Sequence, residues 1–296
     1  MSGIVYYFTG TGNSLAIARD IAETINAELI SISSVVENET VKTDADMIGI
    51  IFPVYHQGIP YIIKRFVNKM VNLDKKYVFG VCTYGDSPGI SLEYLDKAIK
   101  SKGGRLSAGY GVRMPYNYLT PSFVIKDFFN SFGLREITIE KQQKMFNDWD
   151  KKLEGIKEDL QSRKIGKLET QAKIIEKLVD FLNLRETLQK TVWLKIARFE
   201  GYTNLSFVES LQLMDSAFNC DERCNGCGIC SKICPVKNIK MVEGRPLWQH
   251  HCEQCFACLQ WCPKETVQFR NGTMCGKRYH HPKVKLSDML SQGECS

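Results

Sequence analysis

Cysteines dominate the part of the chain in which chemistry is expected. The protein has 296 residues and 12 cysteines, ten of them between Cys220 and Cys275. Within that stretch the pattern C-x2-C-x2-C-x3-C-P occurs twice, over residues 224–235 and 252–263. Three cysteines at this spacing surround three corners of a cubane, and the fourth cysteine ligates the other cluster. The repeat therefore predicts two 4Fe-4S clusters that exchange their fourth ligands.

Each predicted ligand set combines three cysteines of one repeat with the last cysteine of the other. The sets are Cys224, Cys227, Cys230 and Cys262 for the first cluster, and Cys252, Cys255, Cys258 and Cys234 for the second. Disulfides are a weak alternative, because a cytosolic chain keeps its thiols reduced. A single zinc ion is also a weak alternative, because it needs four thiolates in two pairs. Cys220 could replace a ligand, although the pattern is complete without it. Cys82 ends an apolar run and is expected in the core.

A second candidate site lies near the N-terminus, between a predicted strand and a predicted helix. Its residues are Thr9, Gly10, Thr11, Gly12, Asn13 and Ser14. Backbone amides at a helix N-terminus favour phosphate, and the hydroxyl and amide side chains add donors. The loop has no lysine, which a Walker A motif requires. Leu15 stands where a dinucleotide fingerprint needs its third glycine. A phosphate-binding loop is predicted, with an ordinary tight turn as the alternative.

The elements that position these residues alternate between strand and helix over the first 115 residues. Strands are predicted at residues 4–8, 29–32, 47–52, 77–83 and 106–112, and helices at 14–26, 60–71 and 90–101. Such alternation predicts a doubly wound α/β domain with a five-stranded parallel sheet. Residues 135–200 are predicted to form a last covering helix and a helical connector. The apolar stripe at 174–182 favours a packed amphipathic helix. A membrane-surface helix using Trp193, Leu194, Ile196 and Phe199 is the alternative.

Composition and charge limit the class of protein. Hydrophobic residues make up 44% and charged residues 24%, which is typical of a globular protein. The net charge of +6 is spread along the chain, so nucleic acid is not an expected partner. The apolar runs are strand-sized and too short to span a bilayer. No secretory signal is recognised at the N-terminus. A cytoplasmic protein without membrane contact is expected.

Both candidate sites carry a resemblance to known families. Thr9–Ser14 resembles the FMN phosphate loop of flavodoxins. Two further segments follow the next two central strands, where flavodoxins place their isoalloxazine-binding loops; their residues are Pro53, Val54, Tyr55, Thr83, Tyr84, Gly85 and Asp86. With the cysteine repeat, the chain resembles the flavodoxin–ferredoxin fusion proteins of anaerobic bacteria and archaea, called EFR-type ferredoxins. The flavodoxin likeness covers about residues 1–165, and the ferredoxin likeness covers about 215–275.

The resemblance implies a flavodoxin-like fold that binds FMN and a small α+β domain that holds two 4Fe-4S clusters. Tyr55 or Tyr84 would stack on the flavin, and His56 and Asn117 could reach its edge. One feature departs from the family: flavodoxins are typically acidic, whereas residues 1–150 carry equal numbers of basic and acidic side chains. The implied limits are 1–165 for the flavodoxin-like domain, 166–212 for the connector, 213–276 for the ferredoxin domain and 277–296 for a tail.

The function that follows is electron transfer between FMN and the clusters, with redox proteins of anaerobic metabolism as donors or acceptors. The first alternative is an FMN-dependent reductase fed by its own clusters. In that case residues 114–118 and 120–132 would line a pocket for a small oxidised substrate. A redox sensor with structural clusters is the second alternative.

Overall fold

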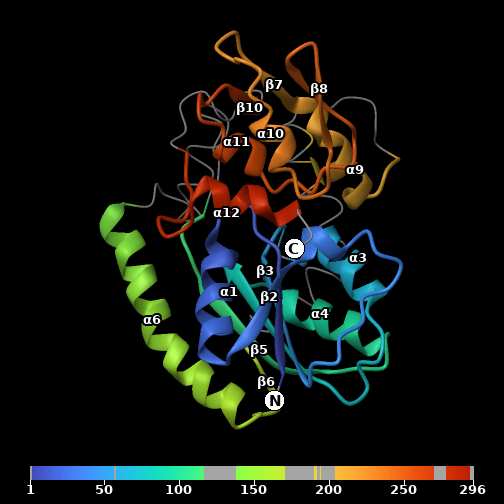
Figure 1. The fold of residues 1–296 in the computed structure, drawn as a ribbon, viewed down its shortest axis with the longest axis vertical. Coiled ribbons are helices and arrows are strands. Elements are labelled where there is room, and N and C mark those ends of the chain that lie inside the picture. Colours follow the sequence, from blue (N-terminus) through green and yellow to red (C-terminus); the bar gives the residue numbers. More distant parts are fainter. Residues whose placement is uncertain are drawn as a thin grey trace. The chain divides into compact units, whose positions relative to one another are not determined.

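The computed structural model describes residues 2–56, 58–116, 138–170, 190, 191, 194, 204–269 and 278–293 (Figure 1). These residues fall into two compact units. The first contains the described residues up to 170, and the second contains those from 190 to 293. The N-terminal loop belongs to the first unit, and both cysteine repeats belong to the second.

A parallel sheet forms the centre of the first unit. Its strands are β1 (Gly3–Tyr7), β2 (Ala27–Ser31), β3 (Met47–Pro53), β4 (Tyr77–Tyr84), β5 (Leu106–Arg113) and β6 (Lys167–Leu168). They are arranged in the order β2-β1-β3-β4-β5-β6, with every pair parallel. The predicted doubly wound sheet is confirmed. The two-residue strand β6, which pairs with Ala108 and Gly109, extends the five predicted strands at one edge.

Helices cover both faces of this sheet. They are α1 (Asn13–Thr24), α2 (Ile32–Val35), α3 (Tyr61–Lys69), α4 (Ser91–Lys100) and α6 (Ile139–Gln161). Helices α1 and α6 pack together on one face, and α3 and α4 pack together on the other (Figure 1). The Trp149 indole of α6 donates a 2.7 Å hydrogen bond to Asp20 of α1. This bond joins the last covering helix to the first.

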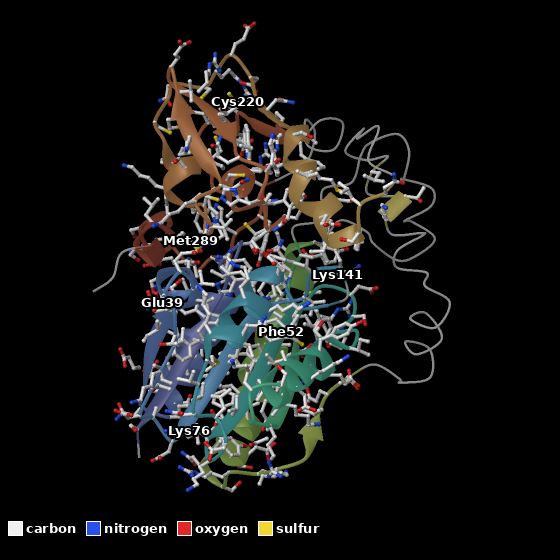
Figure 2. All side chains as sticks on the ribbon, turned by 90° about the vertical axis from the view of Figure 1, so that its right-hand side faces the viewer. Glu39, Phe52, Lys76, Lys141, Cys220 and Met289 are labelled. Atoms are coloured by element: carbon white, nitrogen blue, oxygen red, sulfur yellow. The ribbon has the colours of Figure 1, made fainter. Side chains whose placement is uncertain are left out.

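The core of the first unit consists of strand residues buried on both faces. Ile48, Ile50, Phe52 and Phe79 are completely buried, and Phe52 lies in the middle of the unit (Figure 2). Strands of a parallel sheet covered on both sides read as continuous apolar runs rather than as alternating ones. The central strands were predictable for this reason.

The second unit is built from short elements. They are α9 (Phe207–Leu213), η2 (Met214–Ala217), β7 (Phe218–Cys220), α10 (Ile229–Lys232), β8 (Ile239–Val242), β9 (Arg245–Trp248), α11 (Ala257–Gln260), β10 (Val267–Phe269), α12 (Leu286–Leu290) and η4 (Ser291–Gly293). Strand β7 pairs with β10, and β8 pairs with β9, both antiparallel. This is a small α+β arrangement, as predicted.

The two cysteine repeats share their backbone as well as their sequence pattern. A left-handed residue occurs at three equivalent positions in each repeat. The pairs are Gly226 (φ 72°) with Gln254 (φ 53°), Gly228 (φ 73°) with Phe256 (φ 57°), and Lys237 (φ 52°) with Glu265 (φ 51°). Helices α10 and α11 begin directly after the middle pair. A left-handed conformation is costly for side chains such as Gln254 and Phe256, so the turn is retained in the second repeat against local preference.

Most of the predicted helical connector lies outside the described residues, including the stripe at 174–182 and Trp193, Ile196 and Phe199. Within the part of the chain that the structure describes, no helix has the length and apolar character needed to cross a bilayer.

Candidate functional site

The second unit contains a cavity lined by four cysteines. Its cysteines are Cys224, Cys227, Cys230 and Cys262. We call these four residues the first thiol site. Three of them come from the first repeat, and Cys262 comes from the second, 32 residues beyond Cys230 in the numbering. They are the same four residues that the spacing assigns to one cluster.

The arrangement of these thiols bears on the zinc alternative. Four sulfurs bound to one zinc at about 2.3 Å would lie within about 4 Å of one another. Among the described residues, no group of three or more His, Cys, Asp or Glu side chains is placed to share one metal ion. A single zinc therefore does not fit the arrangement of these thiols, whereas four cysteines from two repeats around one cavity are the donor set of a 4Fe-4S cluster.

The other four predicted ligands also interact with one another. We call Cys234, Cys252, Cys255 and Cys258 the second thiol site. Burial raises the pKa of Cys252 well above its ordinary value, and the nearby Cys255, Cys258 and Cys234 add to the rise. Burial and the neighbouring Cys234 raise the pKa of Cys255 to about 12. Such thiols are protonated at neutral pH unless a cation replaces the proton, so cluster assembly must release protons here.

Hydrogen bonds reach a sulfur at equivalent places in the two repeats. The amide of Asn238 donates to Cys234 Sγ at 3.2 Å, and the amide of Thr266 donates to Cys262 Sγ at 3.4 Å. The Thr266 hydroxyl also lies 3.4 Å from Cys262 Sγ. Burial opposes ionisation of Cys262, but the Thr266 hydroxyl and nearby amides outweigh it and lower the pKa of Cys262. Hydrogen bonds to ligand sulfurs are one of the determinants of a cluster's reduction potential.

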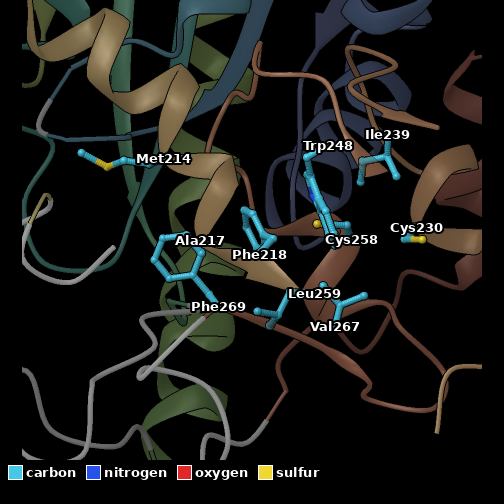
Figure 3. Close-up of a cluster of buried hydrophobic side chains, with 10 residues drawn as sticks. All are labelled: Met214, Ala217, Phe218, Cys230, Ile239, Trp248, Cys258, Leu259, Val267 and Phe269. Carbon is cyan, nitrogen blue, oxygen red and sulfur yellow. The ribbon is translucent and has the colours of Figure 1, made fainter. Parts of the chain in front are cut away.

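An apolar core of the second unit includes one cysteine of each thiol site (Figure 3). Cys230 and Cys258 belong to this buried group, together with Phe218 and Trp248. The rings of Phe218 and Trp248 stack with centroids 5.4 Å apart. This core excludes water and lowers the local dielectric around Cys230 and Cys258.

All ten cysteines of the described residues are free thiols, so no disulfide is present among them. Cys82 is buried in β4, as expected. Cys220 lies beside the first thiol site: Arg245 Nη1 is 3.5 Å from its sulfur, and the neighbouring Cys224 contributes to the raised pKa of Cys220, after burial. Cys275 and Cys295 lie outside the described residues.

In the first unit, the N-terminal loop joins β1 to α1 and is held by its own polar side chains. Thr9 Oγ1 accepts a 3.0 Å hydrogen bond from the amide of Gly12, and Asn13 Nδ2 donates to the carbonyl of Pro115 at 2.7 Å. Gly12 is left-handed (φ 93°) and precedes α1 without a side-chain cap. The first-turn amides of α1 therefore have no capping side chain. An anion such as a phosphate fits this position.

The predicted flavin loops continue directly from the sheet. The amide of Val54 donates to Thr83 at 2.8 Å, and the amide of Met114 donates to Tyr84 at 2.8 Å. The Ser14 and Thr83 hydroxyls lie 2.8 Å apart. The phosphate loop and the segment after β4 are therefore connected. Pro53, Val54 and Tyr55 follow β3 at this same carboxyl edge of the sheet, where ligands of open α/β folds bind.

The tyrosines at this edge have different surroundings. A Cβ on Gly111 would be 3.1 Å from the Tyr84 ring, which therefore lies against β5. Tyr55 packs edge-on against Phe8, with centroids 6.1 Å apart. Tyr116 lies so close to Gly85 that a Cβ there would be 2.5 Å from its ring. Tyr116 was predicted only for the alternative substrate pocket of residues 114–118 and not for the flavin, although its place just after β5 was an available signal.

The remaining predicted flavin-loop residues are placed as follows. Asp86 is exposed, and Gly10 and Thr11 are buried in the N-terminal loop. Burial lowers the pKa of His56 to about 4, so its imidazole is neutral at pH 7. Asn117 lies outside the described residues. Together these segments offer uncapped amides for a phosphate and aromatic and backbone groups for a planar ring.

Comparison with protein families supports both sites. Residues 4–116 match the flavodoxin domain family, and residues 221–240 match the 4Fe-4S binding domain family. The first match spans the N-terminal loop and both predicted flavin loops. The second spans the first cysteine repeat. A flavodoxin domain suggests FMN, and the other domain suggests a 4Fe-4S cluster. No curated protein matches the chain.

Several solved flavodoxins are similar to the first unit. A flavodoxin from the domain Archaea is 18% identical, with 49% of this chain and 99% of that chain covered and a TM-score of 0.32. The two-electron reduced Megasphaera elsdenii flavodoxin is 20% identical, with 40% and 90% covered and a TM-score of 0.31. The flavodoxin of Streptococcus pneumoniae TIGR4 is 17% identical, with 37% and 81% covered and a TM-score of 0.31.

The sheet order, the N-terminal loop and the cysteine cavity agree with these family matches. An N-terminal flavodoxin domain and a C-terminal 4Fe-4S motif are typical of proteins that transfer electrons. The chain thus combines a flavodoxin domain at its N-terminus with a 4Fe-4S binding motif at its C-terminus, a combination that supports an electron-transfer protein of the flavin and iron–sulfur class.

Proposed function

We propose that the protein binds one FMN at the carboxyl edge of its parallel sheet and one 4Fe-4S cluster at each thiol site, and passes electrons between them and redox partner proteins. The observation that carries the proposal is the origin of the fourth thiol in the cavity. Cys262 comes from the second repeat and joins three cysteines of the first. Exchanged fourth ligands are typical of proteins with two clusters.

When bound, FMN can exchange one or two electrons and each 4Fe-4S cluster exchanges one. The protein contributes binding and surroundings. The eight thiols lose their protons to bind iron, and amides at Asn238 and Thr266 stabilise the resulting charge on two of the sulfurs. The apolar core that contains Cys230 and Cys258 keeps water away from them.

For FMN, the uncapped start of α1 would bind the phosphate, and Ser14 would hold that loop to Thr83. Backbone groups of residues 53–55 and 83–86 would bond the edges of the ring. Tyr55 or Tyr84 would stack on the ring, and Tyr116, whose ring lies over Gly85, is a further candidate. Asn117 remains a candidate for the flavin edge.

The proposed partners are redox proteins of anaerobic metabolism, in a cytoplasm that keeps the thiols reduced. Cys227 is the exposed thiol of the first site and offers the cluster there a route to such a partner. The proposed domain limits remain 1–165, 166–212, 213–276 and 277–296. Reoxidation of the reduced protein by added ferredoxins or flavodoxins, without turnover of small oxidised molecules, would support a carrier rather than a reductase.

The test is cofactor analysis of protein purified without oxygen. We expect about eight irons and one FMN per chain, with clusters that are reducible in EPR. Cys227→Ser should perturb or remove one cluster, whereas the matched Cys220→Ser should leave the iron content unchanged. About four irons in the wild-type protein, or full loss of iron from Cys220→Ser, would contradict the assignment of two clusters to these eight cysteines.

A further inference from the structure

The two thiol sites have nearly the same backbone but different surrounding charges. Equivalent amides, of Asn238 and Thr266, donate to the last cysteine of each repeat. The left-handed residues also occur at equivalent positions. Backbone dipoles therefore act similarly on the two sites, and a difference between them must come from side-chain charge and burial.

Asp215 brings a buried carboxylate to the second thiol site. It is completely buried and accepts hydrogen bonds from Asn238 Nδ2 at 2.7 Å and from the His250 amide at 2.8 Å. Its other oxygen lies 2.7 Å from His250 Nδ1. Asn238 is the residue whose own amide bonds Cys234, and His250 is two residues before Cys252. Asp215 is thus linked through Asn238 to Cys234 and through His250 to the segment that carries Cys252, so it contacts the supports of two predicted ligands from different repeats.

Glu253 brings a second carboxylate to the same site. It follows Cys252 in the chain and is 7% exposed. Burial raises the pKa of Cys234, and Glu253 and Asp215 add to the rise. Glu253 contributes in the same direction at Cys255. Glu253 and Asp215 thus place two buried carboxyl groups near the thiols of this site.

The first thiol site has exposed charges of both signs instead, since the acidic Glu222 and Glu265 lie beside it as well as basic residues. Lys264 lines its cavity, and Arg245 reaches Cys220 beside it. Arg278 lies near both sites: burial lowers the pKa of its guanidinium, and Cys262 of the first site and Cys258 of the second act in the opposite direction. Arg278 Nη2 donates to the carbonyl of Val267 at 2.8 Å, while its buried Nε and Nη1 have no hydrogen-bond partner among the described residues. Cluster sulfur is a suitable acceptor for these two donors.

We propose that Asp215 and Glu253 make the cluster at the second thiol site harder to reduce than the cluster at the first. The proposal rests on the proposed function, since it requires a cluster at each site. A fixed negative charge disfavours an added electron, and burial strengthens the effect because screening by water is weak. An electron exchanged between the sites therefore oxidises the second cluster, reduces the first, and breaks no bond. It settles at the site whose Cys227 is exposed.

The experiment is a redox titration of the full, cluster-loaded chain, followed by EPR. Cys227→Ser identifies the signal of the first site, because an oxygen ligand alters the spectrum of that cluster alone. In the wild-type protein we expect this signal to appear before the other as the potential is lowered. Asp215→Asn should favour reduction at the second site on the order of tenfold, which is about 59 mV for one electron. The first site should shift much less.

Three further variants keep the test decisive. Glu253→Gln should shift the second site in the same direction, even if Asp215→Asn fails to fold. Arg278→Gln should disfavour reduction at both sites. Glu243→Gln, at an exposed turn of the same unit, is the matched loss of one negative charge and should shift neither. Two results would overturn this inference but leave the two-cluster function intact. One is eight irons with simultaneous reduction of both clusters, and the other is equal shifts from Asp215→Asn and Glu243→Gln. Fewer irons would instead reject the two-cluster function.

Discussion

The two units of the protein bury different kinds of interior. In the first unit the core is a sheet of aliphatic and aromatic strand residues, and the predicted FMN loops lie beyond the ends of those strands. In the second unit the core includes Cys230 and Cys258, and Cys234, Cys252 and Cys262 pack against it. The cofactor site is an edge feature of one unit and part of the interior of the other.

This difference predicts different dependence on cofactors. We expect the apolar strand residues buried in its sheet to stabilise the fold of the first unit without a ligand. The second unit has strands of three or four residues and several short helices. Small domains of this kind commonly need a metal to fold. We therefore expect FMN to be an addition to a formed fold and the clusters to be part of the fold itself.

Removal of iron should produce the largest difference between the units. After chelation without oxygen, the second unit should unfold, because raised thiol pKa values leave Cys252 and Cys255 protonated and without a shared partner. The first unit should keep its fold. Limited proteolysis would then cleave within residues 204–293 and leave residues 2–116 protected.

Two cysteine variants provide the control for this prediction. Cys255→Ala should reproduce the effect of the chelator on iron content and protease resistance. Cys82→Ala removes a thiol from β4 of the first unit and should leave the iron unchanged. Equal protease resistance of the second unit with and without iron would contradict the proposed role of the clusters in its fold.

Acid should expose the next largest effect, this time in the first unit. Burial lowers the pKa of His56 to about 4 from 6.5. Between pH 6.5 and 4, His56 therefore binds a proton in the unfolded chain but not in the folded chain. Stability is fully present above about pH 6.5 and falls between pH 6.5 and 4, by at most about 3 kcal/mol. Denaturant unfolding of the first unit at several pH values measures this slope.

His56→Asn should flatten that slope, and asparagine tolerates the left-handed backbone found at His56 (φ 50°). The second unit has a counterpart in His281, whose pKa burial also lowers to about 4. There, acid also protonates the cluster thiolates, so loss of iron should precede any effect of the histidine. An unchanged slope in His56→Asn would mean that the acid sensitivity of the first unit arises elsewhere.

The same contrast explains which parts of the molecule could be predicted from the sequence. The central strands were found because they are continuous apolar runs, and the thiol sites because cysteine spacing is specific. Strand β6 was missed because Lys167 and Leu168 have no strand-like pattern of their own and pair only with the edge of β5. Left-handed Gln254 and Phe256 could not be foreseen, because glycine marks that turn only in the first repeat.

The residues around the sites depended on long-range contacts. Asp215 meets Asn238 and His250 across 23 and 35 residues of chain, and local patterns carry no signal for such contacts. Tyr116 meets Gly85 in the same way, through adjacent strand ends. Residues that bind a cofactor had a motif, whereas residues that support them were visible only in the folded structure.

A smaller effect is expected where two predicted FMN segments are joined. Ser14→Ala removes the hydroxyl that lies 2.8 Å from Thr83 Oγ1. We expect FMN affinity to fall about fivefold, since a neutral hydrogen bond contributes about 1 kcal/mol. Thr83→Val should cost a similar amount, and the double variant should cost little more than either. Ser101→Ala, at the exposed end of α4, is the control. Fluorescence titration of the FMN-free protein measures these affinities.

The smallest effect should come from a single hydroxyl in the second unit. Thr266→Val keeps the amide that donates to Cys262 Sγ but removes the hydroxyl 3.4 Å from it. The long distance indicates a weak bond, so the reduction equilibrium at the first thiol site should shift only about twofold toward the oxidised form. FMN affinity should not change.

At Asn238, the equivalent position of the first repeat, the side chain bonds Asp215 instead of a thiol. Asn238→Thr should therefore disturb iron binding more than it tunes a potential, because it removes a link between the Cys234 and Cys252 loops. If Thr266→Val lost iron while Asn238→Thr kept it, the hydroxyl at Cys262 would be a structural element of the site and not a modifier of its potential.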